Sequence, residues 1–338
     1  MRAVIVRNFG PVESAAIGEF PKPVPGPHDI LLKVDATAAN FVDTLVIGGT
    51  YQFLPELPFV PGKLPAGTVA EVGAAVKTLK AGDRVLAMAE HGGYGEFVAV
   101  PETQCFKLPA KMSFVDAAAM ALVYDTSWFA LRDRARYQAG DTVLVLGASG
   151  GVGLASVQLA KAMGAKVLAG ISSPDKADSV RQAGADATID LSRPDLRDSL
   201  RAQVHAATGN RGADIILDPV GGDVFDAALR ALAWRGRLVV IGFASGRIPT
   251  IKANYLLVKN IEVTGLQISD YRKRMPGQLA ACFAEIFALY DAGKIKPAAT
   301  TVMPIEKFAT ALADIRDRKA RGRIVLSQGG ARRSTGQD

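Results

Sequence analysis

A glycine-rich segment that directly follows an apolar run constrains this chain more than any other feature. The run covers 142–146, and the segment Gly147-Ala-Ser-Gly-Gly-Val-Gly153 precedes a helix expected over 154–163. A strand, a tight glycine turn and a helix in that order form the context in which such a motif binds a dinucleotide. Gly150 would let the backbone approach a pyrophosphate, and Gly153 would let the helix pack closely on the strand. A turn without any ligand is the alternative interpretation.

Around this motif, short apolar runs alternate strictly with helix-like segments. Fully apolar strands between helices indicate a parallel sheet that is covered on both faces. This βαβ context favours the dinucleotide interpretation over the ligand-free turn. The expected strands are 142–146, 166–171, 187–190, 214–217, 237–241 and 261–266, and the expected helices are 154–163, 174–183 (with Ser173 as N-cap and Pro174 at its first position), 194–207 and 223–233.

The first ~120 residues have a different texture, with short alternating runs punctuated by glycine and proline. They predict a barrel-like antiparallel fold with strands at 29–36, 68–72, 83–87 and 94–100. Helices follow at 117–122, opened by a capping box at Ser113, and at 127–134. Late in the chain we expect a helix over 279–292 and a strand–helix–strand unit ending at 323–326. The predicted domains are 1–124, catalytic; 125–262, dinucleotide-binding; 263–328, a return to the catalytic domain; and 329–338, a disordered tail.

Composition narrows the class of protein. The chain has 338 residues, 49% of them apolar and 22% charged, as expected of a folded chain with about two domains. The net charge of +7 comes from scattered lysines and arginines, so a nucleic-acid partner is unlikely on this pattern. Its two cysteines are far apart, and no signal peptide or uninterrupted apolar span is present. We therefore expect a cytoplasmic protein without a membrane span.

The end of the second expected strand predicts which nicotinamide nucleotide binds. A site for NAD carries an acidic residue ~20 residues after the glycine turn, where it holds the ribose 2′-hydroxyl. Here the corresponding residues are Ser172 and Ser173, with Lys176 on the first turn of the next helix. Hydroxyls and an ammonium group suit a 2′-phosphate, so the sequence favours NADPH. Lys176 as a solvated helix residue is the alternative, and Asp175 partly offsets its charge.

Several motifs in chain order resemble those of the zinc-free quinone oxidoreductases of the medium-chain dehydrogenase/reductase superfamily, in the zeta-crystallin-like and quinone-oxidoreductase-like branches. The resemblance covers nearly the whole chain. It implies an α/β fold in which a GroES-like β-rich catalytic domain accompanies a doubly wound Rossmann domain, with a cleft between them. Besides the glycine turn, the motifs are Ala39–Thr44, Pro58–Gly62, Lys80–Val85, Gly92–Glu96, Ala160–Ala165, Asp218–Gly222 and Gly322–Val325.

The resemblance also implies where the cofactor lies. NADPH would follow the carboxyl edge of the parallel sheet, and its nicotinamide would reach Asn40 and Thr126. The residues expected to bind it are Asn40, Thr126, Ala148, Ser149, Gly150, Gly151, Val152, Gly153, Ser172, Ser173, Lys176, Gly242, Phe243 and Arg323. Leu191 stands where some relatives carry a tyrosine over the adenosine phosphate, which is a departure from the family pattern.

No metal site is expected. Zinc-dependent relatives place a cysteine and its neighbour where this chain has Asn40 and Asp43, and a histidine where it has Lys63. The cysteine-rich structural zinc lobe is missing, so a tetrahedral site cannot be assembled. The histidines, His28, His91 and His205, are isolated in the sequence. Leu64 also replaces a glutamate that is common in the family.

Four polar residues are the candidates for contact with the reacting group: Asn40, Asp43, Tyr51 and Lys63. Asn40 and Tyr51 could donate hydrogen bonds to a developing oxyanion. Tyr51 as a packing aromatic and Asp43 as a helix-cap carboxylate are the structural alternatives. The ammonium of Lys63 points into the nicotinamide cleft or extends into solvent.

The expected reaction is hydride transfer from NADPH to a quinone or another electron-poor carbonyl, without a dedicated general acid. A reductase of enones or enoyl thioesters has the same fold and cofactor and stays open as an alternative. A non-catalytic NADPH-binding protein is a more distant one. The β-branched segment 260–266 would lie at a sheet edge, so we expect a homodimer paired along it, as the family resemblance also suggests.

Overall fold

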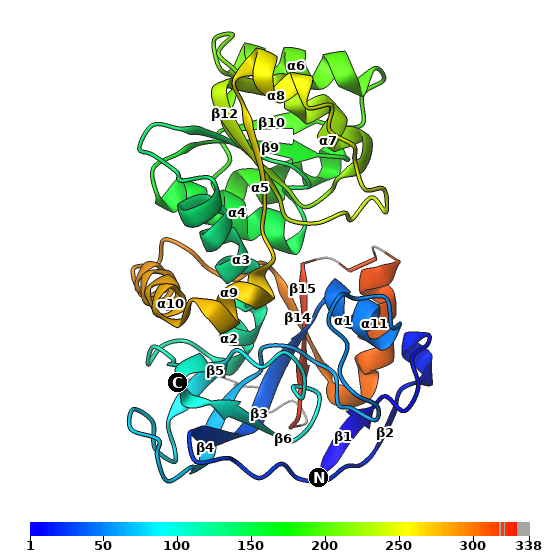
Figure 1. Ribbon diagram of the computed structural model, residues 1–338, viewed down its shortest axis with the longest axis vertical. Helices are drawn as coiled ribbons and strands as arrows, with labels where there is room; N and C mark the ends of the chain where they lie inside the picture. Colours follow the sequence, from blue (N-terminus) through cyan, green and yellow to red (C-terminus); the bar gives the residue numbers. More distant parts are fainter. Residues whose placement is uncertain (318, 321, 330–338) are drawn as a thin grey trace, which may run out of the picture. The chain divides into compact units, whose positions relative to one another are not determined.

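The computed structural model describes residues 1–317, 319–320 and 322–329 and falls into two compact units. The first contains Met1–Leu122, Arg272–Phe283 and the described residues from Lys296 onward, and the second contains Val123–Tyr271 and Ala284–Ile295 (Figure 1). The prediction has the chain return to the first unit once, at residue 263. In the structure it returns twice, because the stretch Ala284–Ile295 packs with the second unit. All but the first residue of the predicted tail lies outside the described residues.

The second unit is built on a six-stranded sheet in the order β10–β9–β8–β11–β12–β13. Every neighbouring pair is parallel, so the predicted doubly wound sheet is confirmed. The order reverses between β8 and β11, and the carboxyl ends of strands at such a point are where ligands bind in open α/β sheets. The strands are β8 (Thr142–Val145), β9 (Lys166–Ile171), β10 (Ala187–Asp190), β11 (Ala213–Asp218), β12 (Leu232–Val240) and β13 (Glu262–Gly265).

The helices of this unit depart from the predictions in several places, and no helix is predicted at α8 (Asn254–Lys259). The segment expected as one helix over 174–183 splits into a 3₁₀ turn, η4, and α5. The helix expected to reach residue 233 stops earlier, because Leu232 already pairs with Ala213 in the sheet. The elements are α3 (Val123–Phe129), the π-helical η3 (Ala130–Arg134), α4 (Gly151–Ala162), η4 (Pro174–Lys176), α5 (Ala177–Gln182), α6 (Leu196–Ala207), α7 (Gly222–Ala228), η5 (Leu229–Ala231) and α8 (Asn254–Lys259).

The first unit contains a seven-stranded sheet in the order β14–β15–β3–β4–β5–β7, with β6 paired to β3, and a separate β1–β2 ribbon. The antiparallel arrangement predicted for the first ~120 residues is confirmed. The later strands β14 and β15 are parallel to each other, because α11 crosses between them. The strands are β1 (Arg2–Ile5), β2 (Ala16–Glu19), β3 (Asp29–Ala39), β4 (Ala66–Val72), β5 (Arg84–Ala87), β6 (Phe97–Pro101), β7 (Cys105–Lys107), β14 (Thr300–Pro304) and β15 (Arg323–Ser327).

Short helices complete the first unit. At the start of α2 the Ser113 hydroxyl accepts a hydrogen bond from the Asp116 N–H at 3.0 Å, which confirms the N-cap predicted there. The remaining helices are α1 (Phe41–Ile47), α2 (Phe114–Met120), α11 (Phe308–Arg316), and the 3₁₀ turns η1 (Val12–Ser14), η2 (Glu102–Gln104) and η6 (Ile305–Lys307), while α9 (Ile268–Arg274) and α10 (Pro276–Asp291) include residues of both units.

Two surface properties bear on the earlier expectations. Strand β13 is at the end of the sheet order, and Leu257 and Val258 just before it are 77% and 72% exposed. Pairing of two copies along this edge stays a prediction. In the described part of the chain no single helix is long and apolar enough to cross a membrane, although α2 and the α3–η3 segment taken together pass that test by length and composition.

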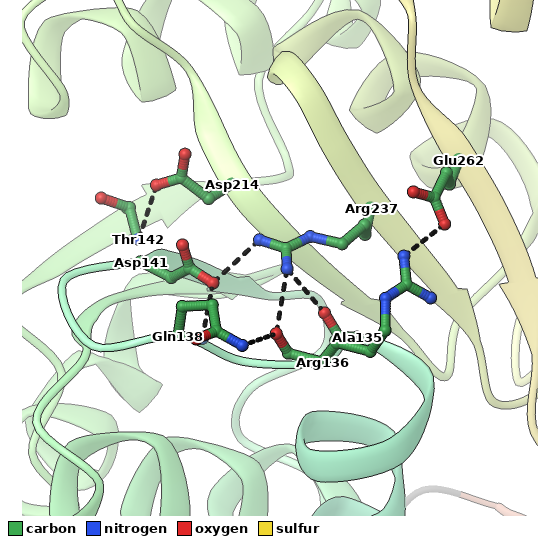
Figure 2. Close-up of polar contacts among 8 residues, drawn as sticks. All are labelled: Ala135, Arg136, Gln138, Asp141, Thr142, Asp214, Arg237 and Glu262. Atoms are coloured by element: carbon green, nitrogen blue, oxygen red, sulfur yellow. Dashed lines mark hydrogen bonds and ion pairs between the residues drawn. The ribbon is translucent and has the colours of Figure 1, made fainter.

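One arginine fixes the chain segment that leads into the central strand β8. The guanidinium of Arg237 on β12 donates to the carbonyl oxygens of Ala135 and Arg136 at 2.9 and 3.1 Å and to the Asp141 carboxylate at 2.8 Å (Figure 2). The side chains of Arg237 and Asp141 are only 14% and 15% exposed. Because β8 begins at Thr142, these contacts anchor the strand that carries the glycine turn at its other end.

Replacement of Arg237 by methionine should therefore be costly. The Arg237→Met variant removes the guanidinium from a largely buried carboxylate and two carbonyl oxygens, so the unfolding free energy should fall by about 3 kcal/mol in denaturant titrations. Arg136→Met is the matched control, because the Arg136–Glu262 ion pair is exposed (53% and 56%) and its loss should cost less than about 1 kcal/mol. Equal losses in the two variants would contradict this account.

Candidate cofactor and active site

The tight turn between β8 and α4 requires a residue without a side chain at position 153. A Cβ atom there would lie 2.3 Å from the Gly147 carbonyl oxygen and 2.6 Å from the Ala148 Cα, so only glycine lets the helix come this close to the strand. Gly147 itself has a positive φ of 58°, which glycine adopts without strain. Ala148 is buried and its N–H donates to the Gly170 carbonyl.

Gly150 has a different role from Gly153. It is the exposed N-cap of α4, and a Cβ there would meet only the Gly147 carbonyl oxygen at 3.4 Å, an ordinary contact. The packing of the protein therefore does not require glycine at this position. The first backbone bond of the helix runs from Leu154 N to the Gly150 carbonyl, so the N–H groups of residues 151–153 precede it and are available to an anion. This arrangement fits a pyrophosphate at the helix N-terminus.

The end of β9 presents an exposed lysine beside a carboxylate. Ser172 and Lys176 are exposed, and the Ser173 hydroxyl donates to the carboxylate of Asp175. Ser173 is the N-cap residue of η4 and Pro174 occupies its first position, as predicted, although the Ser173 side chain makes no capping hydrogen bond. Leu191, at the family's tyrosine position, is 9% exposed and belongs to the apolar core. Lys176 therefore supplies the positive charge after β9, and the neighbouring carboxylate of Asp175 partly offsets it.

A set of buried hydroxyls connects α3 to α4. The Ser127 hydroxyl donates to the Val123 carbonyl at 2.7 Å, lies 2.9 Å from the Ser156 hydroxyl and 3.2 Å from the Val152 carbonyl oxygen. Thr126, one residue earlier and 5% exposed, is therefore on a helix fixed to the first turn of α4. The sequence analysis missed Ser127 and Ser156. Polar residues inside an otherwise apolar helix were the available signal.

The turn after β11 lies against the glycine turn. A Cβ at Gly147 would be 2.8 Å from Val220, and the Asp218 carboxylate accepts from the N–H groups of Val220 and Gly221 at 2.8 and 3.0 Å. The second oxygen of Asp218 is buried without a hydrogen-bond partner in the described chain, and burial raises the pKa of this carboxyl. Gly242 donates to the backbone carbonyl of Asp218, and the neighbouring Phe243 is 40% exposed.

In the first unit, Asp43 is a buried carboxylate at the start of α1. It accepts the Asn40 N–H at 2.8 Å and the Tyr94 hydroxyl at 3.0 Å, and it is 1% exposed. The helix-cap interpretation of Asp43 therefore describes its contacts. Gly62 makes room for this arrangement, because a Cβ there would lie 2.3 Å from the Tyr94 ring. Tyr94 is a functional neighbour that the sequence analysis did not identify.

Burial governs the ionisation of Asp43. Desolvation raises its pKa from 3.8 to about 6, and the hydrogen bond from Asn40 and the charge of Lys63 only partly oppose that rise. The same burial, together with the charge of Asp43, raises the pKa of Tyr94. At neutral pH the protein therefore carries a desolvated negative charge at this point.

The Asn40 side chain is held on both sides. Its Nδ2 donates to the Ala38 carbonyl at 3.0 Å, and its Oδ1 accepts from Arg323 at 2.8 Å. Arg323 also donates to the Ala119 carbonyl at 3.1 Å near the end of α2. Asn40 is 3% exposed and Arg323 is 9% exposed. Arg323 thus orients Asn40, and a cofactor contact for either side chain stays a prediction.

Lys63 is buried in an ion-pair network rather than extended into solvent. Its ammonium pairs with the Glu90 carboxylate, whose other oxygen accepts from Arg272 at 3.1 Å. The side chains of Lys63 and Arg272 are 5% and 1% exposed, so the solvent alternative is wrong. The Lys63 ammonium also lies 5.5 Å from the centroid of the Tyr51 ring, a cation–π distance. Sequence reasoning missed Glu90 and Arg272.

Within the described ranges, no three histidine, cysteine, aspartate or glutamate side chains are grouped so that they could hold a metal ion. Cys105 and Cys282 are buried free thiols. His28 and His91 are exposed, and His205 is half-buried near the end of α6. The polar centre of the first unit therefore consists of amide, carboxylate, hydroxyl, ammonium and guanidinium groups.

Comparisons with known proteins identify the family to which this chain belongs. Residues 26–110 match the family model described as alcohol dehydrogenase GroES-like domain, and residues 151–285 match the one described as zinc-binding dehydrogenase. The chain is 40% identical to the quinone oxidoreductase-like protein 2 homolog of Nematostella vectensis over 305 residues, 89% of this chain and 82% of the relative. It is 34% identical to the quinone oxidoreductase of Mus musculus over 317 residues, 93% and 94% of the two chains.

A solved structure gives the same result. The Escherichia coli quinone oxidoreductase, crystallised in complex with NADPH, aligns with a TM-score of 0.86 at 29% identity, over 97% of this chain and all of that one (100%). A GroES-like unit combined with a six-stranded parallel Rossmann sheet is the architecture of the medium-chain dehydrogenases and reductases, and the chain belongs to that superfamily. Within it, the identities place the chain in the quinone oxidoreductase-like branch.

The buried charge of Asp43 predicts a pH-dependent stability. Because its pKa in the folded state is raised from 3.8 to about 6, the contribution of this group to stability is most favourable below pH 4 and is lost as the pH rises through 6. A rise of that size corresponds to about 3 kcal/mol at pH 7. Asp43→Asn removes the titration, so its cost relative to the wild type should shrink between pH 4 and pH 7. Denaturant unfolding of both proteins at the two pH values measures this, and a cost that is independent of pH would contradict it.

Proposed function

We propose that this protein is an NADPH-dependent oxidoreductase that reduces quinones or similar electron-poor carbonyl compounds without zinc. The observation that carries the proposal is the turn at Gly150, where the protein's own packing leaves room for a pyrophosphate beside the first N–H groups of α4. Membership of the quinone oxidoreductase-like branch and the NADPH complex of the Escherichia coli relative support the choice of cofactor and acceptor.

The chain's own residues divide the work of binding. The N–H groups of residues 151–153 and the positive end of the α4 dipole would hold the pyrophosphate. Lys176, with the Ser172 hydroxyl, would bind the 2′-phosphate. Bound NADPH would supply a hydride to the acceptor.

The polar groups of the first unit would act on the acceptor. Lys63 is buried, positively charged and close to Tyr51, so its field favours negative charge on an acceptor oxygen near these side chains. Asp43 accepts the backbone N–H of Asn40 and so holds its backbone in place, while Arg323 holds its side chain. A reduced quinone can take its protons from water, so none of these groups needs to be a strong acid.

The decisive assay follows the loss of NADPH absorbance with a panel of acceptors. We expect turnover with 1,4-benzoquinone and 9,10-phenanthrenequinone, and slower turnover with NADH in place of NADPH. Preference for simple enones would reassign the substrate class within the same fold. Tight NADPH binding without turnover of any acceptor would contradict an enzymatic role.

Cofactor preference should depend on two adjacent side chains of opposite charge. Lys176→Ala should weaken NADPH binding by about 10-fold or more and leave NADH almost unchanged, because only NADPH carries the 2′-phosphate. Asp175→Ala removes the opposing carboxylate and frees the Ser173 hydroxyl, so it should tighten NADPH binding. Fluorescence titration of both nucleotides measures these effects, and equal losses for NADPH and NADH in Lys176→Ala would exclude the assignment.

The role of Lys63 can be separated from its structural ion pair. Lys63→Met keeps the length of the side chain, and Glu90 retains its contact with Arg272, so the fold should persist. We expect kcat/KM for quinones to fall by up to ~10-fold while the Kd for NADPH stays the same. Lys33→Met, an exposed lysine of β3 in the same unit, is the matched control and should be neutral. Unchanged kinetics in Lys63→Met would leave Lys63 with a structural role alone.

A further inference from the structure

The second unit contains a cavity of about 510 Å³ that has no part in the site described above. It lies between the start of α6, α7 with η5, and the segment 247–255 that leads into α8, helices that lie together in this unit (Figure 1). Its lining contains none of the residues assigned to dinucleotide binding. The cavity is formed entirely by residues of the second unit.

Positive charge is in excess around this cavity. Four cationic side chains line it against two carboxylates, Asp223 and Asp226, and both carboxylates are paired with Arg247. Arg230 pairs with Asp198 outside the lining. The other two cations, Arg197 and Lys252, make no side-chain hydrogen bond or ion pair in the portion of the chain that the structure describes. Both side chains are exposed, so they can turn towards an anion in the cavity.

The positive charge around this cavity also affects a nearby lysine. The ammonium of Lys259, on α8, donates to the backbone carbonyls of Leu229 and Arg230 at 3.3 and 2.9 Å. Burial lowers the pKa of Lys259, and the charges of Arg201 and Arg230 lower it further. The positive charge of Arg230, which lines the cavity, therefore also acts on Lys259.

The rest of the lining is apolar and aromatic. Leu229 is buried, Leu196 and Tyr255 are half-buried, and Ala227 completes this surface. Such a wall suits an aromatic or other planar apolar body, while the guanidinium groups suit a phosphate, which they bind through paired N–H donors. A dianionic phosphate ester also matches the two cations, Arg197 and Lys252, that are left without a partner.

We propose that this cavity binds a phosphate monoester with an aromatic body, with Arg197 and Lys252 holding the phosphate and Tyr255 contacting the ring. The site is separate from the dinucleotide turn. It would bind its ligand whether or not the proposed reductase activity is correct, so the two proposals can fail independently.

The test uses 1-naphthyl phosphate as the probe, titrated calorimetrically into the full-length protein in the presence of excess NADPH. We expect saturable binding with one probe per chain. The double variant Arg197→Gln/Lys252→Gln should weaken it by at least ~10-fold, which is the loss of about one charge-assisted contact. The matched control is Arg211→Gln, because Arg211 is an exposed arginine of the same unit that does not line the cavity. This variant should leave binding unchanged.

Two further ligands separate the contributions of charge and ring. Tripolyphosphate should compete with the probe, and 1-naphthol, which lacks the phosphate, should bind more weakly than 1-naphthyl phosphate. The absence of saturable binding would overturn the proposal. So would binding that the Arg211→Gln and Arg197→Gln/Lys252→Gln variants lose equally, or binding that NADPH displaces and Lys176→Ala abolishes, since that result would place the probe at the dinucleotide turn.

Discussion

The contact between α4 and β8 at Gly153 is the constraint on which the second unit depends. A single methyl group there would overlap the Gly147 carbonyl and the Ala148 backbone, so the helix could not start where it does. That start point sets the direction of the free N–H groups of residues 151–153. The opposite end of β8 is fixed by the Arg237 contacts with residues 135–141 (Figure 2). The packing at Gly153 and these contacts together hold the central strand in a single position. The position of these N–H groups is thus a consequence of packing rather than of any charged residue.

The first unit uses a different principle, in which buried charges hold one another. Asp43 fixes Asn40 and Tyr94, Arg323 fixes the other side of Asn40, and Glu90 accepts from both Lys63 and Arg272. Desolvation makes each of these charges costly unless its partners stay in place, so the network defines a single geometry. Within this network, the positive charge of Lys63 is held in place by its ion pair with Glu90.

Local patterns in the sequence predicted most of the fold, because parallel strands are continuous apolar runs and the turns contain glycine. The strand over 166–171 and the N-cap at Ser113 follow from neighbouring residues alone. The pairing of Arg272 with Glu90 does not, because 182 residues separate them and neither position carries a local signal. The parallel pairing of β14 with β15 also depends on a crossover rather than on the strands themselves. For Lys63, the sequence located the residue but not its burial, which only the packing around it determines.

The account rests on the claim that the turn at Gly150 is shaped for a dinucleotide, and one substitution tests it directly. Gly150 has φ and ψ values of −79° and 173°, which any residue can adopt, and a Cβ there makes only an ordinary contact. Gly150→Val should therefore fold with an unfolding free energy within about 1 kcal/mol of the wild type. Its side chain would occupy the space proposed for the pyrophosphate, so the Kd for NADPH should rise at least ~10-fold. A folded Gly150→Val protein that binds NADPH as tightly as the wild type would contradict the account.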